Sequence, residues 1–412
     1  MGLRTVALAT MMAALGLAAM GSTAGADTLG TIKIGVLNDM SGPYADVSGK
    51  GSVIAAQLAA DDFAKEAGAG GPRVEILAGD HQNKADIGAN LARAWIDRDG
   101  VAAVVDVPNS AVALAVSQIM REKDRAFLAS SSATSDLTGS QCAPTTVQWT
   151  FDTWALANGT ARAVSRQGGR KWFFIGSDYA LGAALIRDAT EVIKAEGGSV
   201  VGDVRAPLGT SDYSSYLLQA QASGADVIAT ANGGDDAINT IKQATEFGLG
   251  RAAGQRLAGL LVFLTDVKGM GLQTAQGLLL TEAFYWDLDD TTRAWSQRFA
   301  ARSGGKMPTM NHAGVYSETL LYLRAAVAVG SVSGRAVVAK MKAAPIDDPL
   351  FGPTTIREDG RAVHRMFLFR AKKPADSKGP YDLYDVVATI PAAEAFRPMA
   401  QGGCSLVTAG KS

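Results

Sequence analysis

A row of hydroxyl-bearing residues is the most concentrated chemical signal in this sequence. Residues 129–139 read ASSSATSDLTG, and six of these eleven residues carry a hydroxyl. The row follows the apolar residues 126–128, so it begins where a buried strand should end. Hydroxyls and backbone N–H groups at such a place can hold a small anion, since a hydrogen bond to a charged group contributes about 1.5–3 kcal/mol. The alternative is a polar connection in which Ser135 or Asp136 only caps the next helix.

Within this row, Ser132, Ala133 and Thr134 are the candidate anion contacts, because a sheet would leave their backbone N–H groups unpaired. The turns after the other expected strands are also rich in small hydroxyl, amide and glycine residues and poor in Lys, Arg and His. They lie at residues 38–44, 80–83, 106–110, 176–179, 232–236 and 265–266. Ligands gather at the carboxyl ends of the strands in open parallel sheets. The set therefore indicates capture of a small polar molecule.

The segments that must position these turns alternate between strand-like and helix-like patterns. Apolar strands are expected at residues 31–37, 73–78, 101–107, 126–128, 171–175, 199–204, 226–231 and 259–264. Amphipathic helices are expected between them, at residues 53–67, 86–99, 110–121, 181–195, 213–222 and 235–247, with Ser110 as an N-cap. Apolar strands separated by such helices are typical of parallel sheets covered on both faces. The sequence thus predicts an α/β fold of two similar units in tandem.

The segments after the second unit follow a more mixed pattern. Residues 278–286 predict a strand that leaves the second unit, and residues 313–329 predict a long helix. Residues 361–370 and 381–390 are expected to be β segments.

The histidines and the common motifs give little support for an enzyme. His81, His312 and His364 show no H-x-x-x-H spacing for a metal, and each is expected to be an isolated surface or loop residue. No nucleophile elbow, Walker phosphate loop or strand-linked dinucleotide motif is present. The sequence therefore predicts no catalytic residue, metal or cofactor. A hydrolase built on Ser131 or Ser132 stays an alternative, although no base lies nearby in sequence.

The N-terminus and the composition indicate an exported chain. Residues 1–26 combine a short basic start, an apolar run and a small-residue site, which predicts a signal peptide cleaved after Ala26. The net charge of −1 does not suggest a nucleic-acid partner. Cys142 and Cys404 are the two cysteines, and an even count in an exported chain favours a disulfide over two free thiols.

Taken as a set, the motifs resemble the type I periplasmic solute-binding proteins of ABC importers, the leucine/isoleucine/valine-binding group. The resemblance covers the mature chain and rests on IKIGVL at 32–37, SGP at 41–43, the serine at 110, SAT at 132–134, ANGG at 231–234, IKQA at 241–244 and GLLL at 277–280. It implies two Rossmann-like lobes joined by a three-segment hinge that close on a ligand. The expected division assigns 27–151 and about 283–345 to an N-terminal lobe. It assigns 152–282 and about 346–395 to a C-terminal lobe, and 396–412 to a tail that returns to the first lobe.

The resemblance also assigns ligand-binding roles. Ser110 with Ser132, Ala133 and Thr134 would hold a ligand carboxylate, and the second lobe would add an aromatic side chain, Tyr179. Asp266 is the nearest match to the acid that receives the ligand ammonium in the amino-acid binders.

The chain departs from the amino-acid binders at one position. Where they place a tyrosine, this chain has Asn232 or Gly233, which puts an α-amino acid ligand in doubt.

Two further features are similar to a branch linked to aromatic or other organic acids. These are residues 149–160 and the two distant cysteines, and the likeness supports the Cys142–Cys404 pairing. Tyr44, Tyr179, Phe284 and Trp286 would supply an aromatic wall, although ordinary packing is an equal alternative for each.

The expected protein is thus a monomeric periplasmic receptor that binds a small carboxylate without transforming it. It would present its closed form to an ABC permease in the inner membrane. The alternatives are an exported sensor that reports the ligand to a signalling receptor, or an exported hydrolase.

Overall fold

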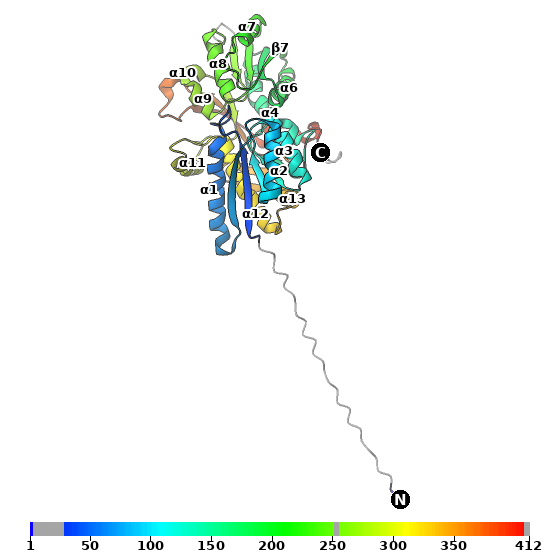
Figure 1. Ribbon diagram of the computed structural model, residues 1–412. Coiled ribbons are helices and arrows are strands. Elements are labelled where there is room, and N and C mark those ends of the chain that lie inside the picture. The colour runs from blue at the N-terminus through cyan, green and yellow to red at the C-terminus, as the bar shows by residue number, and fades with distance from the viewer. Residues whose placement is uncertain (3–28, 251–254, 408–412) are drawn as a thin grey trace.

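The computed structural model describes residues 1–2, 29–250 and 255–407, and the last two of these ranges form two α/β lobes (Figure 1). The expected signal peptide falls almost entirely outside the described residues. The first lobe holds a parallel sheet of order β2-β1-β3-β4-β5. Its strands are β1 Thr31–Asn38, β2 Arg73–Asp80, β3 Val101–Asp106, β4 Ala126–Ala129 and β5 Thr146–Gln148. Every residue of β3 is buried, as expected for a central strand covered on both faces.

The helices of the first lobe come from two separate stretches of the sequence, residues 49–122 and 290–342, and pack around this sheet. They are α1 Gly49–Ala67, α2 Ala85–Ala94, α3 Ser110–Glu122, α11 Asp290–Arg302, α12 Met310–Val329 and α13 Gly334–Lys342. Helix α12 packs along α1 and is buried over most of its length. Among the described residues, no single helix is long and apolar enough to cross a membrane, and α12 passes that test only together with α13, across a bend of 108°.

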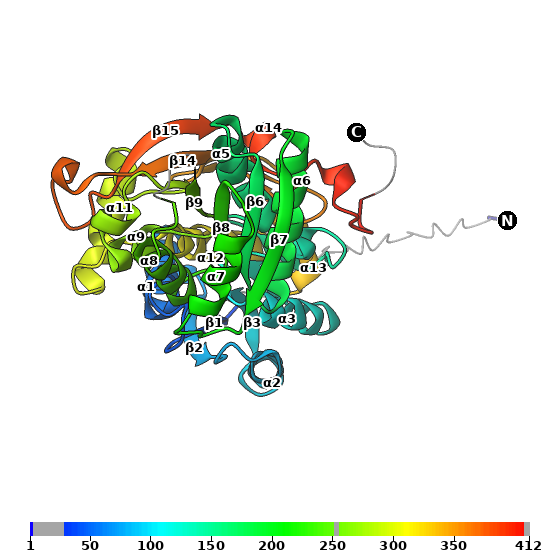
Figure 2. The ribbon, with the colours of Figure 1, turned by 90° about the horizontal axis from the view of Figure 1, so that it is seen from above.

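The second lobe repeats the arrangement with a parallel sheet of order β7-β6-β8-β9. Its strands are β6 Lys171–Ser177, β7 Ser199–Ala206, β8 Val227–Ala231 and β9 Arg256–Gly259. Its helices are α4 Thr153–Leu156, α5 Arg162–Arg166, α6 Ala180–Ala195, α7 Ser214–Ala222, α8 Asp235–Glu246, α9 Leu264–Met270 and α10 Leu272–Ala275. A second, antiparallel sheet of β10 Leu279–Glu282, β14 Met366–Ala371 and β15 Tyr384–Ile390 lies along one side, as the view from above shows (Figure 2).

Three chain segments cross between the lobes. They follow β5, β10 and the short strand β13 Ala362–Val363. Arg361 ties two of these crossings together, because its buried guanidinium donates to the carbonyls of Trp149 and Phe151. It also lies 3.6 Å from the carboxylate of Asp152.

The C-terminal segments bear on the division into lobes. Strand β13 pairs with β12 Gly352–Ile356, which pairs in turn with β11 Ile346–Asp348, and Arg361 forms a parallel bridge with Gln148 of the first sheet. We therefore propose to assign residues 346–363 to the first lobe, and to keep the other boundaries as expected from the sequence.

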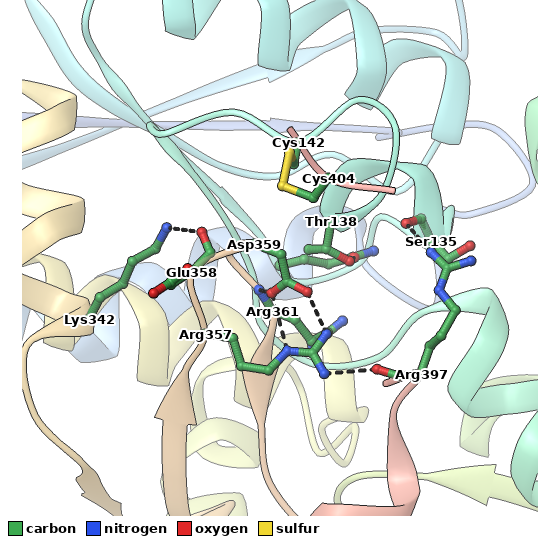
Figure 3. The surroundings of a disulfide bond; sticks show 11 residues. Ser135, Thr138, Cys142, Lys342, Arg357, Glu358, Asp359, Arg361, Arg397 and Cys404 are labelled. Atoms are coloured by element: carbon green, nitrogen blue, oxygen red, sulfur yellow. Dashed lines mark hydrogen bonds and ion pairs between the residues drawn. A yellow bond between two sulfur atoms is a disulfide. The ribbon is translucent and has the colours of Figure 1, made fainter. Parts of the chain in front are cut away.

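A disulfide closes the tail onto the first lobe. Cys142 and Cys404 are bonded, with their Cα atoms 5.6 Å apart (Figure 3). The same region holds Arg357, which pairs with Asp359 at 2.6 Å and donates to the carbonyl of Arg397 in the tail. The short helix α14 Ala392–Ala395 comes directly before the tail. The disulfide expected from the cysteine count is thus confirmed.

Several local expectations were wrong. Asn109, not Ser110, caps α3, because its side chain accepts from the amides of Ala111 and Val112. The strand expected at 259–264 ends at Gly259, and α9 begins at Leu264.

His81 and His364 lie in loops, as one of the two expectations for the histidines had it, whereas His312 lies in α12. His81, His312 and His364 are all buried rather than exposed. Burial lowers the pKa of each to about 4, so the rings are neutral at pH 7. His364 contacts the carbonyls of Trp149 and Arg365 through its two ring nitrogens, which makes it part of the hinge packing.

Candidate functional site: the strand ends between the lobes

A buried carboxylate organises the strand ends of the first lobe. Asp106, the last residue of β3, accepts hydrogen bonds from the hydroxyls of Ser130 and Ser131 and from the side-chain amide of Asn38. Burial raises the pKa of Asp106, and these hydrogen bonds oppose the rise. One acceptor thus joins the loops that follow β1, β3 and β4.

The backbone at this point is strained. Asp106 and Val107 have φ angles of 81° and 58°, which are rare for residues other than glycine and costly for a β-branched residue. The hydroxyl of Ser132 donates to both carbonyls of this segment, at 3.2 and 2.6 Å. The consecutive serines therefore fix a strained turn, and their hydroxyls are used within the protein.

The backbone amides of the same row are not used within the described part of the protein. Among the described residues, the N–H groups of Ser132, Ala133 and Thr134 have no acceptor within hydrogen-bonding distance. The carbonyl of Ala133 accepts from Thr153, and the carbonyls of Ser132 and Thr134 accept from Gln148, so this loop is held rigidly. A rigid row of free N–H groups suits an anion.

Two hydroxyls belong to the candidate site, and only one of them has a hydrogen-bond partner in the described residues. The hydroxyl of Thr134 caps a short 3₁₀ helix, Ser135–Thr138, by accepting from the amide of Asp136 at 3.3 Å. The helix cap expected at Ser135 or Asp136 is therefore Thr134. The hydroxyl of Ser110 is fully buried and has no hydrogen-bond partner in the described part of the chain.

The second lobe presents Tyr179 and Asn232 at the ends of β6 and β8. The hydroxyl of Tyr179 meets the hydroxyl of Tyr44 in the first lobe, and burial is the main reason that the pKa of both phenols is raised. The side-chain amide of Asn232 donates to Thr240 at 3.0 Å, while its carbonyl oxygen is buried and unpaired within the described residues.

Asp266 caps the N-terminus of α9, the helix in which it lies. Its carboxylate accepts from the amide of Phe263 at 2.9 Å and closes the first turn of α9. The residue is 2% exposed, and burial raises its pKa to about 7. A carboxylate held in this way is a poor partner for a ligand ammonium.

Contacts between the lobes lie at both ends of the site. Near the mouth, the amide of Asp235 donates to the carbonyl of Pro43 at 3.3 Å, beside the tyrosine pair. Near the hinge, the hydroxyl of Ser135 donates at 2.6 Å to Asp188 on α6, which is fully buried. The two lobes are therefore in a closed arrangement.

The expected aromatic wall divides into two groups. Tyr44 and Tyr179 meet between the lobes. Phe284 packs edge-on against Trp295, and the indole of Trp286 donates to the carbonyl of Tyr381 at 2.8 Å. The second pair is thus engaged in packing.

Several residues that organise the candidate site and the hinge have no recognisable sequence pattern. Asp106 is visible as an acid at the end of an apolar strand, but nothing in the sequence shows that three loops converge on it. Asp188 lies at a buried position of α6 and Arg361 in a β segment, and both acquire their roles only from residues far away in the chain. In the described residues, no group of three or more His, Cys, Asp or Glu side chains is placed to hold a metal ion.

The comparison with known families agrees with this architecture. The family profile described as "Periplasmic binding protein" matches residues 31–379. The chain belongs to the periplasmic binding protein family. This periplasmic binding protein has two tandem α/β lobes with parallel sheets, the type I arrangement expected from the sequence.

Solved structures of the same fold are similar over nearly the whole chain. A periplasmic binding protein from Burkholderia mallei is 45% identical, with a TM-score of 0.88, and the match covers 93% of this chain and 100% of that one. A branched-chain amino acid ABC transporter periplasmic ligand-binding protein from Burkholderia xenovorans LB400 is 42% identical, with a TM-score of 0.80 and coverage of 91% and 99%. A solute-binding protein from R. palustris in complex with benzoate shares the fold at 20% identity, with a TM-score of 0.77 and coverage of 88% and 97%.

A curated relative matches a shorter stretch. The Leu/Ile/Val-binding protein homolog 6 of Brucella melitensis biotype 1 is 29% identical over 264 residues. That match covers 61% of this chain and 63% of the relative, so the chain spans less than two thirds of the length of the curated relatives it matches.

Proposed function

We propose that this periplasmic binding protein captures a small organic carboxylate between its lobes and delivers it to the permease of an ABC importer. The observation that carries the proposal is the row of unpaired amides at Ser132, Ala133 and Thr134, with the unpaired hydroxyl of Ser110 at the start of α3, the helix that follows the neighbouring strand. Since β1, β3 and β4 are parallel, their ends lie at one edge of the sheet, the edge at which Tyr44 meets the second lobe.

The strength of such a site is sufficient for a transport receptor. Hydrogen bonds to a charged group contribute about 1.5–3 kcal/mol each. Three or four of them approach the roughly 8 kcal/mol that corresponds to micromolar affinity, before the cost of ordering the ligand is subtracted. No arginine is needed, which agrees with the neutral character of these turns.

The ligand we propose lacks an α-ammonium group. Asp266, the expected ammonium partner, is used as a helix cap and has a raised pKa. Asn232 and Gly233 stand where amino-acid binders place a tyrosine. These features favour a 2-oxo acid or an aromatic acid over a branched-chain amino acid, and the Tyr44–Tyr179 pair offers aromatic surface for such a ligand.

The proposal also covers the cellular location and the oligomeric state of the protein. A signal peptide cleaved after Ala26 would place the mature chain in the periplasm, where it would act as a monomer without a cofactor and without chemistry on its ligand. The closed, ligand-bound state would be the one that the permease recognises. A ligand that contacts both lobes favours this state because it binds the closed arrangement more tightly than the open one.

The test is a thermal-shift screen followed by calorimetry with L-leucine, its 2-oxo acid 4-methyl-2-oxopentanoate, and benzoate. We expect stabilisation by at least one acid without an amino group. The affinity for that acid should fall tenfold or more in Ser110→Ala, whose hydroxyl is unpaired, and less in Thr134→Ala, which keeps its backbone amide and loses a hydroxyl that caps the 3₁₀ helix. Tighter binding of L-leucine than of its 2-oxo acid would contradict the ligand class. Binding of amides or urea with no response to any acid would contradict the anion site itself.

A further inference from the structure

A cavity of about 690 Å³ opens where the two lobes meet, and none of the residues assigned above to the carboxylate site lines it. The first lobe contributes the start of α1, the end of α11 and the loop that leads into α12. The second lobe contributes α9 and Tyr381. Because its walls belong to different lobes, the cavity has this shape only in the closed arrangement.

The charged groups of this cavity are mostly cationic. Lys50, Lys268, Arg302 and Lys306 line it, against a single carboxylate, Asp46. His312 also lines it, but burial lowers the pKa of this ring to about 4 and keeps it neutral at pH 7. The wall therefore carries a net positive charge.

Two of the cations have no carboxylate partner. Arg302 pairs with Asp61 at 2.7 Å, and Lys306 lies 3.4 Å from Asp46. Lys50 and Lys268 have no carboxylate within 4 Å among the described residues. Lys268 lies instead over the ring of Tyr381, 4.5 Å from its centroid, and donates to the carbonyl of Pro380 at 3.4 Å. One uncompensated cation thus comes from each lobe.

The position of Lys50 adds a second argument. It is the second residue of α1, a helix of 19 residues with no acidic residue in its first turn. A lysine there opposes the helix macrodipole, which is positive at this end and favours anions. The arrangement costs stability and concentrates positive potential at the cavity wall.

The remaining residues of the cavity wall suit a ligand that is partly apolar. Met40, Ile54, Phe299 and Met307 line the cavity as well. The hydroxyl oxygen of Thr265, on the second lobe, is buried and has no hydrogen-bond partner within the described residues. The cavity therefore offers apolar surface, one unsatisfied hydroxyl and two ammonium groups without a carboxylate partner in the described part of the chain.

We propose that this interlobe cavity is a second binding site, which takes an organic carboxylate with an apolar body and bridges Lys50 and Lys268. It is separate from the amide row, and its occupancy stabilises the closed arrangement because the two cations belong to different lobes. The inference rests on the lobe closure invoked in the proposed function, but not on the role of Ser110 or Thr134.

The experiment is calorimetric titration of the full mature chain with benzoate, with benzamide as the uncharged probe of the same shape. The variants are Lys50→Gln/Lys268→Gln for the cavity and Ser110→Ala/Thr134→Ala for the amide row. The matched control is Lys194→Gln/Lys340→Gln, which removes one exposed lysine from each lobe outside any ion pair in the described residues. All four lysines are exposed, and melting curves will verify that the variants fold.

We expect a benzoate-binding event that is weakened at least tenfold by the cavity variant and is unchanged in the control and in the amide-row variant. It should weaken as salt rises, and benzamide should not reproduce it. The inference is overturned if benzoate shows no event that depends on Lys50 and Lys268, or if benzamide binds equally well. Benzoate binding lost only in the amide-row variant would support the proposed function and contradict this second site, so the two failures are distinguishable.

Discussion

The hydroxyl of Tyr44 in the first lobe meets the hydroxyl of Tyr179 in the second. The two residues are 135 positions apart in sequence, and they follow the first strand of their respective sheets. Beside them, the amide of Asp235 reaches the carbonyl of Pro43 across the same boundary. The contact is therefore a direct link between the lobes, placed at the mouth of the proposed carboxylate site.

Removing this link should favour the open arrangement. A net hydrogen bond contributes about 0.5–1.5 kcal/mol, so Tyr179→Phe is expected to weaken carboxylate affinity about two- to tenfold. Small-angle scattering should show a more extended molecule at subsaturating ligand. Tyr216→Phe, in the second lobe and away from the boundary, is the control. Unchanged affinity and shape in Tyr179→Phe would show that the tyrosine pair does not hold the lobes together.

Asp266 should make the protein less stable as the pH rises. Its pKa is raised from 3.8 to about 7, so the folded state binds this proton more tightly than the unfolded state does. The contribution of Asp266 to the free energy of unfolding is therefore fully present below about pH 4. Roughly 4 kcal/mol of this contribution is lost as the pH rises through 7. Chemical denaturation of wild type and Asp266→Asn at pH 5 and pH 8 measures the effect.

In Asp266→Asn we expect a much smaller loss of stability between these two pH values. A residual slope should remain, because the pKa of Asp236 is also raised, to about 6, mainly by burial. Equal slopes in the wild type and the variant would contradict the burial of Asp266 in the folded state.

The disulfide should stabilise the fold without affecting the ligand. Cys142 and Cys404 are separated by 262 positions, and loop-entropy reasoning gives an upper value of about 5 kcal/mol for a loop of this length. Cys142→Ser/Cys404→Ser should therefore melt at a clearly lower temperature and still bind the carboxylate. Reduction of the wild type should reproduce the shift. A loss of ligand affinity in the folded variant would assign the tail a role in the site.

Arg361 should tolerate no replacement by lysine. Its guanidinium reaches the carbonyls of Trp149, Phe151 and Ala362 with different nitrogens, a geometry that a single ammonium cannot provide. Arg361→Lys should lose several kcal/mol in urea denaturation, in line with about 3–5 kcal/mol for disrupting a buried pair. Arg335→Lys, an exposed arginine of α13, is the control. Wild-type stability in Arg361→Lys would show that this hinge contact carries little energy.

The sequence by itself determined the order of the elements and hence the fold class. Apolar runs such as residues 101–106 and amphipathic stretches such as 181–195 encode strand and helix locally, because side-chain periodicity follows from backbone geometry alone. The pairing of Cys142 with Cys404 also followed from composition, since only one pairing exists for two cysteines. Turn polarity marked the edge of each sheet at which the two lobes contact each other.

Only the tertiary structure decided which polar atom finds which partner. The serines at 130–132 hold Asp106 and the strained turn after it, and the amides, not these hydroxyls, are left free. Asp266 closes its own helix, and the interlobe cavity combines residues as distant as Lys50 and Tyr381. Hydrogen bonds and electrostatic fields depend on distances set by the packing of both lobes, and local sequence patterns do not contain those distances.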